Sequence, residues 1–302
     1  MNWTHPEQGL LTPLHAASAS GHLSVVNALI AARAVVDRVN VQGFTALMYA
    51  AQQGHEAIVS VLHRVAAASV HHVNNQGFTA MHMAAKNGHV GVVRVLLRAR
   101  DYPNVVSTDG SRSSPLELAS VCSHPAAVQA LIEGGANVNY SRPDGVTSLM
   151  LAAQLGHIEV VRALLAAGAN VNQANTQGAT ALMVAAQNGH IEVVRALLAV
   201  NSDPRIVTYN GNTALSLAKA KNHPAIAALL EARLAELAAA GSARMIVRAR
   251  ERGRDIGRSR DCCFCDGLYK LTAATGLYEP IPCTQSLRPR FLGEPRLQGC
   301  WE

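Results

Sequence analysis

Aromatic side chains are scarce in this sequence: they make up 4% of its 302 residues, whereas hydrophobic residues as a whole make up 49%. The core must therefore be aliphatic and rich in alanine, which suits closely packed helices better than one large core. Uncharged apolar runs are also short. The most apolar late stretch, residues 225–240, contains Glu231, Arg233 and Glu236, so we expect no membrane-spanning helix.

The sequence also lacks the motifs of common catalytic sites. It has no Gly-rich phosphate loop, no Gly-x-Ser-x-Gly motif and no cluster of carboxylates with histidine. Its first residues show no basic segment followed by an apolar run, so we expect no secretory signal. We therefore expect a cytoplasmic protein, with the nucleus as the alternative compartment, that is not an enzyme and has no cofactor.

A repeat organises most of the chain. The eleven residues from Gly156 to Ala166 recur unchanged from Gly189 to Ala199, 33 positions later. Such self-similarity, at a period of about 20–50 residues, is typical of stacked repeat proteins. One Thr or Ser marks each of seven copies, spaced by 33 to 35 residues: Thr12, Thr45, Thr79, Ser114, Thr147, Thr180 and Thr213.

Each copy predicts two short helices and a turn. Thr and Ser are good N-caps, and Pro13 and Pro115 fit the first helical position, where the missing N–H of proline costs nothing. Residues 158–165 have the apolar spacing of an amphipathic helix, and the Asp-Gly or Gln-Gly pairs that follow suit a hairpin-like finger. One copy leaves a hydrophobic face uncovered, so stacking must complete the core.

The segments that follow these anchors, such as Thr12-Pro-Leu-His15 and Thr45-Ala-Leu-Met48, resemble the start of the ankyrin repeat. The resemblance covers residues 1–237. It implies an all-α fold, an ankyrin-repeat solenoid of helix-turn-helix units with β-turn fingers. Beyond it, the change in composition predicts a basic, cysteine-containing and disordered tail over residues 238–302. Family members generally bind proteins along the concave side, so the resemblance also implies a monomeric scaffold or adaptor with a protein partner.

Carried over repeat by repeat, the resemblance places the partner-binding residues at the finger tips and at exposed positions of the first helices. This surface is rich in amides, carries little charge and includes two of the four phenylalanines. The two rings either anchor an interface or lie flat on their own hairpins. The residues are Gln42, Phe44, Gln52, Gln53, Gln76, Phe78, Lys86, Asn87, Asp144, Val146, Gln154, Leu155, Gln177, Gln187 and Asn188.

Nine of the thirteen histidines recur at two fixed places in the repeat, either three or ten residues after the anchor. Such regularity predicts that their rings satisfy backbone groups between neighbouring repeats, since a metal site needs ligands that converge. His63 differs, because it stands where other repeats carry Leu97, Ile132, Leu165 and Leu198. We interpret His63 as a local packing defect.

The tail differs in composition from the repeats. Residues 241–302 carry eleven Lys and Arg against seven Asp and Glu. A targeting segment or a site for an acidic partner is one interpretation, whereas nucleic-acid binding is not expected because no aromatic residues interleave with the arginines. Four cysteines could supply zinc ligands, but a second close pair is missing, so we expect reduced thiols and no metal. They are Cys262, Cys265, Cys283 and Cys300.

Two alternative functions follow from the tail. The chain could be the substrate-recognition subunit of a ubiquitin ligase, with the tail recruiting the remaining subunits, although it lacks the Leu-Cys-Arg box that some ankyrin adaptors carry. It could also be a regulatory ankyrin protein that the basic tail directs to its place of action.

Overall fold

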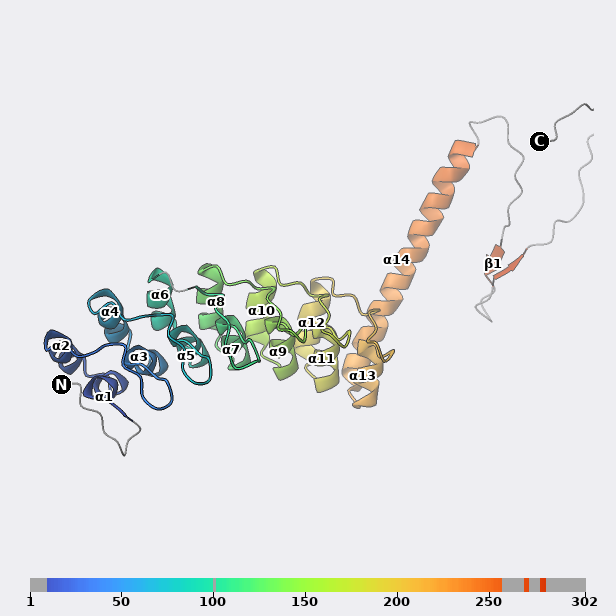
Figure 1. Ribbon diagram of the computed structural model, residues 1–302. Helices are drawn as coiled ribbons and strands as arrows, with labels where there is room; N and C mark the ends of the chain where they lie inside the picture. Colours follow the sequence, from blue (N-terminus) through green and yellow to red (C-terminus); the bar gives the residue numbers. More distant parts are fainter. Residues whose placement is uncertain (1–9, 100–101, 257–268, 272–277, 281–302) are drawn as a thin grey trace, which may run out of the picture. The chain divides into compact units, whose positions relative to one another are not determined.

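The computed structural model describes residues 10–99, 102–256, 269–271 and 278–280. The chain divides into two compact units, residues 1–240 and 241–302. In the first unit, helices are paired and the pairs stack side by side (Figure 1). This arrangement confirms the predicted solenoid of helix-turn-helix units.

Seven first helices lie on one side of the stack and seven second helices on the other (Figure 1). The first helices are α1 (Pro13–Ala19), α3 (Ala46–Gln53), α5 (Ala80–Lys86), α7 (Pro115–Val121), α9 (Ser148–Leu155), α11 (Ala181–Asn188) and α13 (Ala214–Ala220). The second helices are α2 (Leu23–Ala31), α4 (Glu56–Arg64), α6 (Val90–Arg98), α8 (Pro125–Glu133), α10 (Ile158–Ala166), α12 (Ile191–Ala199) and α14 (Pro224–Ile256).

The repeated Thr or Ser sets the start of each first helix. In α3 the backbone N of Met48 donates a hydrogen bond to Oγ1 of Thr45 at 3.3 Å. In α1 the cap is reciprocal, because the backbone N of Thr12 also donates to Nδ1 of His15 at 3.0 Å. Both arrangements satisfy backbone N–H groups that have no partner inside the helix.

The Gly-His pair between the two helices of a repeat joins that repeat to its neighbour. Gly54 has a φ of +80°, and the Nε2 of His89 in the next repeat donates to the carbonyl oxygen of Gln52 at 2.9 Å. This contact confirms the interpretation of the regular histidines. Equivalent bonds are made by His55, His124, His157, His190 and His223.

The core is aliphatic, as the composition requires, and runs through the whole stack as one cluster. Each first helix packs on the first helices of adjacent repeats, from α1 on α3 to α11 on α13. Buried alanine pairs such as Ala84 and Ala85 allow these helices to approach closely. The second helices from α4 to α14 each place one fully buried leucine at an equivalent position: Leu62, Leu96, Leu131, Leu164, Leu197 and Leu230.

The last repeat ends in a long helix, since α14 continues to Ile256, past the boundary at residue 237 that the sequence predicted for the repeats. Lys219 of α13 and Glu231 of α14 form an ion pair at 2.7 Å on the polar outer side of this repeat. The second unit contains a short antiparallel pair, β1 (Tyr269–Leu271) and β2 (Tyr278–Pro280), which the sequence did not predict. No helix in the described ranges is both long and apolar enough for a membrane span.

Candidate functional site

The finger before each first helix is a tight hairpin whose tip is fixed by one side chain. In the finger before α3, Oδ1 of Asn40 accepts hydrogen bonds from the backbone N of Gln42 and Phe44, both at 2.9 Å. Gly43 within this turn has a φ of +77°, a conformation that glycine adopts without strain. Asn74 and Asn175 fix their fingers in the same way.

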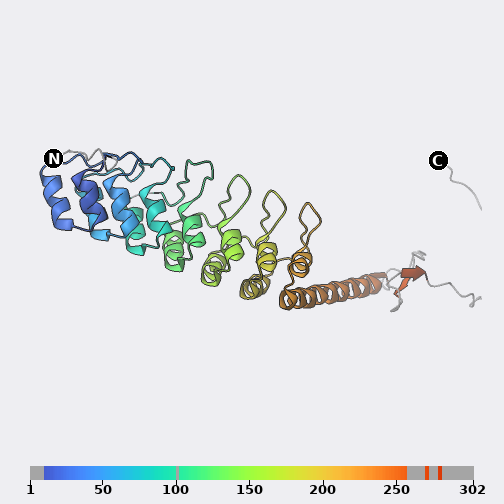
Figure 2. The ribbon, with the colours of Figure 1, turned by 90° about the horizontal axis from the view of Figure 1, so that it is seen from below.

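Neighbouring fingers are joined by backbone hydrogen bonds and lie side by side along one edge of the stack (Figure 2). The N of Asn75 donates to the carbonyl oxygen of Gln42 at 3.0 Å, and the N of Tyr209 donates to that of Gln177 at 3.1 Å. The residues at the tips therefore form a row. We call this row, together with the exposed residues near the ends of the first helices, the finger face.

The structure brings the predicted binding residues together on the finger face, where eleven of the fifteen are exposed. Among the described residues, the seven glutamine side chains of this set have no hydrogen-bond partner. Asn87 and Asn188 each donate from Nδ2 to a backbone oxygen of their own helix at 2.8 Å, which leaves Oδ1 free to accept. The half-buried residues are Phe44, Gln52, Phe78 and Val146.

The two phenylalanine rings rest partly on their own repeats. The centroid of Phe44 lies 5.2 Å from that of Tyr49, and the centroid of Phe78 lies 5.4 Å from that of His82. Both rings pack against the core and remain half-buried. Burial lowers the pKa of His82 to about 4, so this neighbour of Phe78 is uncharged at neutral pH.

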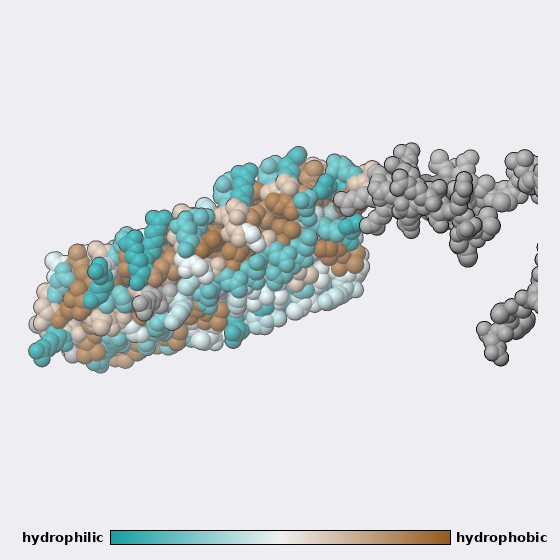
Figure 3. Space-filling model, turned by 90° about the horizontal axis from the view of Figure 1, so that it is seen from above, coloured by the Kyte–Doolittle hydropathy of each residue, from teal (hydrophilic) through white to brown (hydrophobic). Residues whose placement is uncertain are grey.

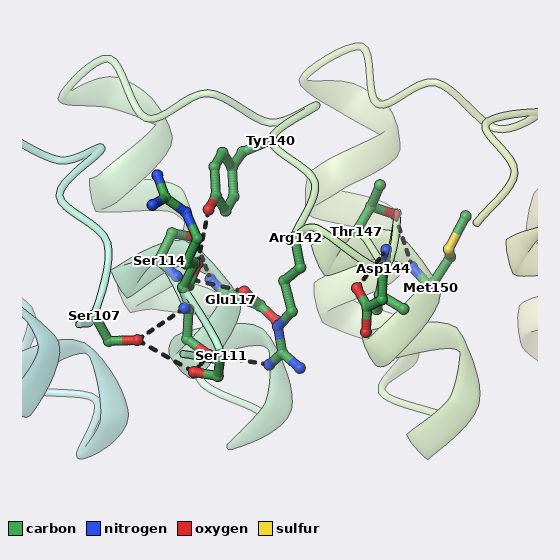
Figure 4. A network of polar contacts seen from close by, with 12 residues as sticks. Ser107, Ser111, Ser114, Glu117, Tyr140, Arg142, Asp144, Thr147 and Met150 are labelled. Carbon is green, nitrogen blue, oxygen red and sulfur yellow. Dashed lines mark hydrogen bonds and ion pairs between the residues drawn. The ribbon is translucent and has the colours of Figure 1, made fainter. Parts of the chain in front are cut away.

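Between the fingers before α7 and α9, side-chain contacts take the place of the backbone hydrogen bond that joins other fingers. Pro143 stands where other fingers have Asn75 or Thr176, and proline has no N–H with which to bond the preceding finger. Side chains connect the two fingers instead (Figure 4). The hydroxyl of Tyr140 donates to the carbonyl oxygen of Arg112 at 2.8 Å, and Nη2 of Arg142 donates to Oγ of Ser113 at 3.1 Å.

Arg142 also forms an ion pair with Glu117, the third residue of α7 (Figure 4). Glu117 occupies the repeat position of His15 and His82, whose Nε2 atoms donate to backbone oxygens of the following finger. Its side chain is 2% exposed. Burial raises the pKa of Glu117 to about 7, and the guanidinium of Arg142 acts in the opposite direction. A contact between a carboxyl group and a guanidinium therefore replaces the histidine contact at this junction.

Two serines and an aspartate shape the finger before α7. Oδ1 of Asp109 accepts from Oγ of Ser107 at 2.7 Å and from Oγ of Ser111 at 2.6 Å. These bonds hold the pKa of Asp109 below its ordinary value. They fix the shape of the finger.

The pair of Glu117 and Arg142 was missed by the sequence analysis, although two signals were present. Glu117 breaks the histidine position of the repeat, and Arg142 occupies the position of Asn40 and Asn74. The four cysteines suggested as zinc ligands, Cys262, Cys265, Cys283 and Cys300, lie outside the described residues. Within the described ranges, His, Cys, Asp and Glu form no group of three or more that could hold a metal ion.

The comparisons with known proteins agree with this architecture. The family model described as ankyrin repeats matches residues 2–70, 61–142, 99–175 and 149–237. The human ASB11 ankyrin repeat domain is 27% identical and superposes with a TM-score of 0.66, covering 74% of this chain and 98% of that domain. The ankyrin repeat domain of Bcl-3, a member of the IkappaB protein family, is also 27% identical, with a TM-score of 0.63 and coverage of 72% and 97%.

No curated protein sequence matches the chain. The family model nevertheless spans more than half of the residues, and the paired helices, the capped first helices and the row of fingers recur throughout the matched ranges. This chain belongs to the ankyrin repeat family.

Proposed function

We propose that this protein is a non-enzymatic adaptor that binds a partner protein on the finger face. Ankyrin repeats are in general protein–protein interaction modules, and the matched region covers the whole row of fingers. The observation that carries the proposal is the row of unpaired glutamine amides. Each amide is both a donor and an acceptor, so it can bond the backbone or the polar side chains of a bound segment.

The composition of the finger face indicates what kind of segment it binds. Of the fifteen residues, Lys86 and Asp144 alone carry charge, while Leu155 is 45% exposed and two phenylalanine edges lie near the tips. A partner segment that is partly apolar and rich in hydrogen-bonding groups fits such a surface. Because few charges take part, we expect the affinity to depend weakly on salt.

The repeat spacing fits an extended segment. Packed helices lie about 8–10 Å apart, and an extended chain rises about 3.3 Å per residue, so one repeat corresponds to about three residues of partner. Glutamines recur at the same finger position in three repeats, at Gln42, Gln76 and Gln177. Partner residues at a spacing of about three should therefore meet equivalent amides.

Affinity capture with the full-length chain tests the proposal. Replacing Gln53 and Gln187 by Glu places two unpaired charges on the finger face, and we expect the affinity for a captured partner to fall by about tenfold or more. A matched control carries Ser24→Glu and Asn27→Glu, two exposed changes of the same charge on the second helix α2. Equal binding by both variants would exclude the finger face as the site.

Two further variants locate the contact more closely. Phe44→Ala and Phe78→Ala should also weaken the complex by about tenfold, but both rings pack on their own repeats, so unfolding of these variants must be measured alongside. A fragment of residues 1–240, one compact unit, separates the remaining alternatives. Partners that the full-length chain captures and this fragment does not must depend on residues 241–302. Such partners are expected if the chain is a ubiquitin-ligase subunit or a protein with a targeting tail.

A further inference from the structure

A hollow of about 410 Å³ lies on the opposite side of the stack, between the second helices α4 and α6. Figure 3 shows this side, where hydrophilic ridges alternate with apolar strips. The volume is near the lower end of the range of small-ligand sites, about 300–1,000 Å³. Its lining residues are Ser60, His63, Arg64, Val95, Arg98 and Ala99.

The hollow exists where the repeat pattern fails. In the next repeat Leu97 replaces His63 and extends to the following helix pair, since a Cβ added at Gly134 would lie 2.5 Å from its Cδ1. His63 does not fill the equivalent space. Its Nδ1 is buried without a hydrogen-bond partner in the described part of the chain, so no bond fixes the orientation of the ring. The packing defect inferred from the sequence is thus an open hollow with a polar wall.

Two arginines give the hollow its charge. Arg64 and Arg98 end α4 and α6 at equivalent positions, and neither has an ion pair or a hydrogen bond with any described residue. The arginines of later second helices are paired, since Arg162 lies 2.8 Å from Glu159 and Arg195 lies 3.7 Å from Glu192. Arginine in a last helical turn complements the helix dipole, but that role alone does not explain two unpaired guanidinium groups beside one hollow.

Acidic groups lie elsewhere on the adjoining helices. Glu133 follows Arg64 and Arg98 in the repeat pattern, and its Oε1 accepts a hydrogen bond from Nε2 of Gln129 at 3.0 Å. Glu56 is at the opposite end of α4, about 12 Å away along the helix axis at the usual rise per residue. Among the described residues, no carboxylate lines the hollow. The part of the hollow that the structure describes is therefore cationic, with no counter-ion of its own.

We propose that this hollow binds the phosphate of a phosphorylated serine or threonine in a partner protein. A phosphate monoester carries about two negative charges at neutral pH, which matches two guanidinium groups. Each guanidinium presents a fork of donors suited to phosphate oxygens, and the hydroxyl of Ser60 adds another donor. Val95 and Ala99 supply an apolar wall for the side-chain carbons of the modified residue.

The surroundings favour a single phosphate on a polypeptide over a phosphate polymer. The cationic site extends over two repeats, and exposed Arg94 lies one turn before Arg98 on α6, whereas Glu133, Glu159 and Glu192 follow on the later second helices. A nucleic acid lying along this face would meet those carboxylates. A phosphorylated peptide needs to place only its phosphate group in the hollow, and its remaining residues need not contact this side of the stack.

NMR titration of the full-length protein with a short phosphothreonine peptide tests this proposal. We expect saturable shifts confined to α4 and α6, with no such shifts for the same peptide carrying threonine. Arg64→Gln and Arg98→Gln should each weaken binding by about tenfold. His63→Leu, which introduces the residue found in other repeats, should fill the hollow and abolish binding while keeping the fold. Arg162→Gln is the matched control and should bind as the wild type does.

Three results would overturn the proposal. One is a titration in which the phosphorylated and unmodified peptides give the same shifts. Another is full binding by the Arg64→Gln and Arg98→Gln double variant. The third is a single-stranded oligonucleotide that binds at α4 and α6 more tightly than the peptide, which would assign the hollow to phosphodiesters. Gln53→Glu and Gln187→Glu lie on the finger face and should leave peptide binding unchanged, so the two proposals can fail independently.

Discussion

The glycine that ends a first helix is required for two separate reasons at the scale of one residue. At Gly54 the φ of +80° is strained for any other residue, and a Cβ would lie 2.5 Å from Nδ1 of His89. We expect Gly54→Ala to lower the free energy of unfolding by about 2–3 kcal/mol, from backbone strain and from loss of the histidine bond. Urea unfolding measures the change.

Gly135 offers a matched control for this prediction. Its φ is +89°, but no atom lies within 4 Å of the position a Cβ would take. Gly135→Ala should therefore cost about 1 kcal/mol, from the backbone alone. If both variants lose the same free energy of unfolding, the contact between Gly54 and His89 contributes nothing to stability. The hydrogen bonds of the regular histidines would then not couple neighbouring repeats.

At the scale of elements, Glu117 links α7 to the next finger and makes stability depend on pH. Its pKa is raised to about 7 in the folded protein. The unfolded chain then releases this proton at a lower pH than the folded chain, so stability falls as pH rises from about 4.5 to 7. Glu117→Gln lacks this titration, so we expect the stability difference between the two proteins to shift in favour of the variant by about 3 kcal/mol as pH rises from 4 to 7.

The free energies of unfolding of the wild type and of Glu117→Gln should be compared at each pH. This comparison is needed because His82 also titrates and changes stability with pH in the opposite direction. The pKa of His82 is lowered to about 4, so its contribution is present above the unfolded value of about 6.5 and is lost as pH falls towards 4. The difference between wild type and Glu117→Gln cancels that contribution. A constant difference between pH 4 and 8 would mean that Arg142 keeps Glu117 ionised and that burial does not govern its pKa.

The elements could be predicted from the sequence because they depend on local chemistry that recurs. Caps such as Thr45, the histidines after each glycine and the amides at the tips all repeat at a fixed period, so each copy supports the interpretation of the others. Glu117 and Arg142 could not be paired in this way, since both depart from the pattern and lie in different repeats. The hollow beside His63 depended likewise on how far the neighbouring side chains extend, which the period does not specify.

At the scale of the whole repeat stack, helix contacts are made within a repeat or between adjacent repeats. Every well-packed pair of helices in the described part of residues 1–240 belongs to one repeat or to adjacent repeats. Stability in such a stack is approximately a sum of repeat and interface contributions. The finger face and the phosphate-binding hollow lie on different sides of it, so one partner can occupy each without displacing the other.

Because each repeat packs only on its neighbours, we expect a destabilising substitution at one end of the stack to affect the stability of the nearby repeats only. Leu14 of α1 is 2% exposed, and Leu14→Ala should cost about 3 kcal/mol through lost burial and a cavity. Native-state hydrogen exchange should then show amides of α1 to α4 exchanging about 100-fold faster, with those of α9 to α12 unchanged. Leu182→Ala, which truncates a buried side chain of α11, should give the reverse pattern. Equal acceleration in all seven repeats would instead show that the stack opens as one cooperative unit, whose coupling extends beyond the contacts between neighbours.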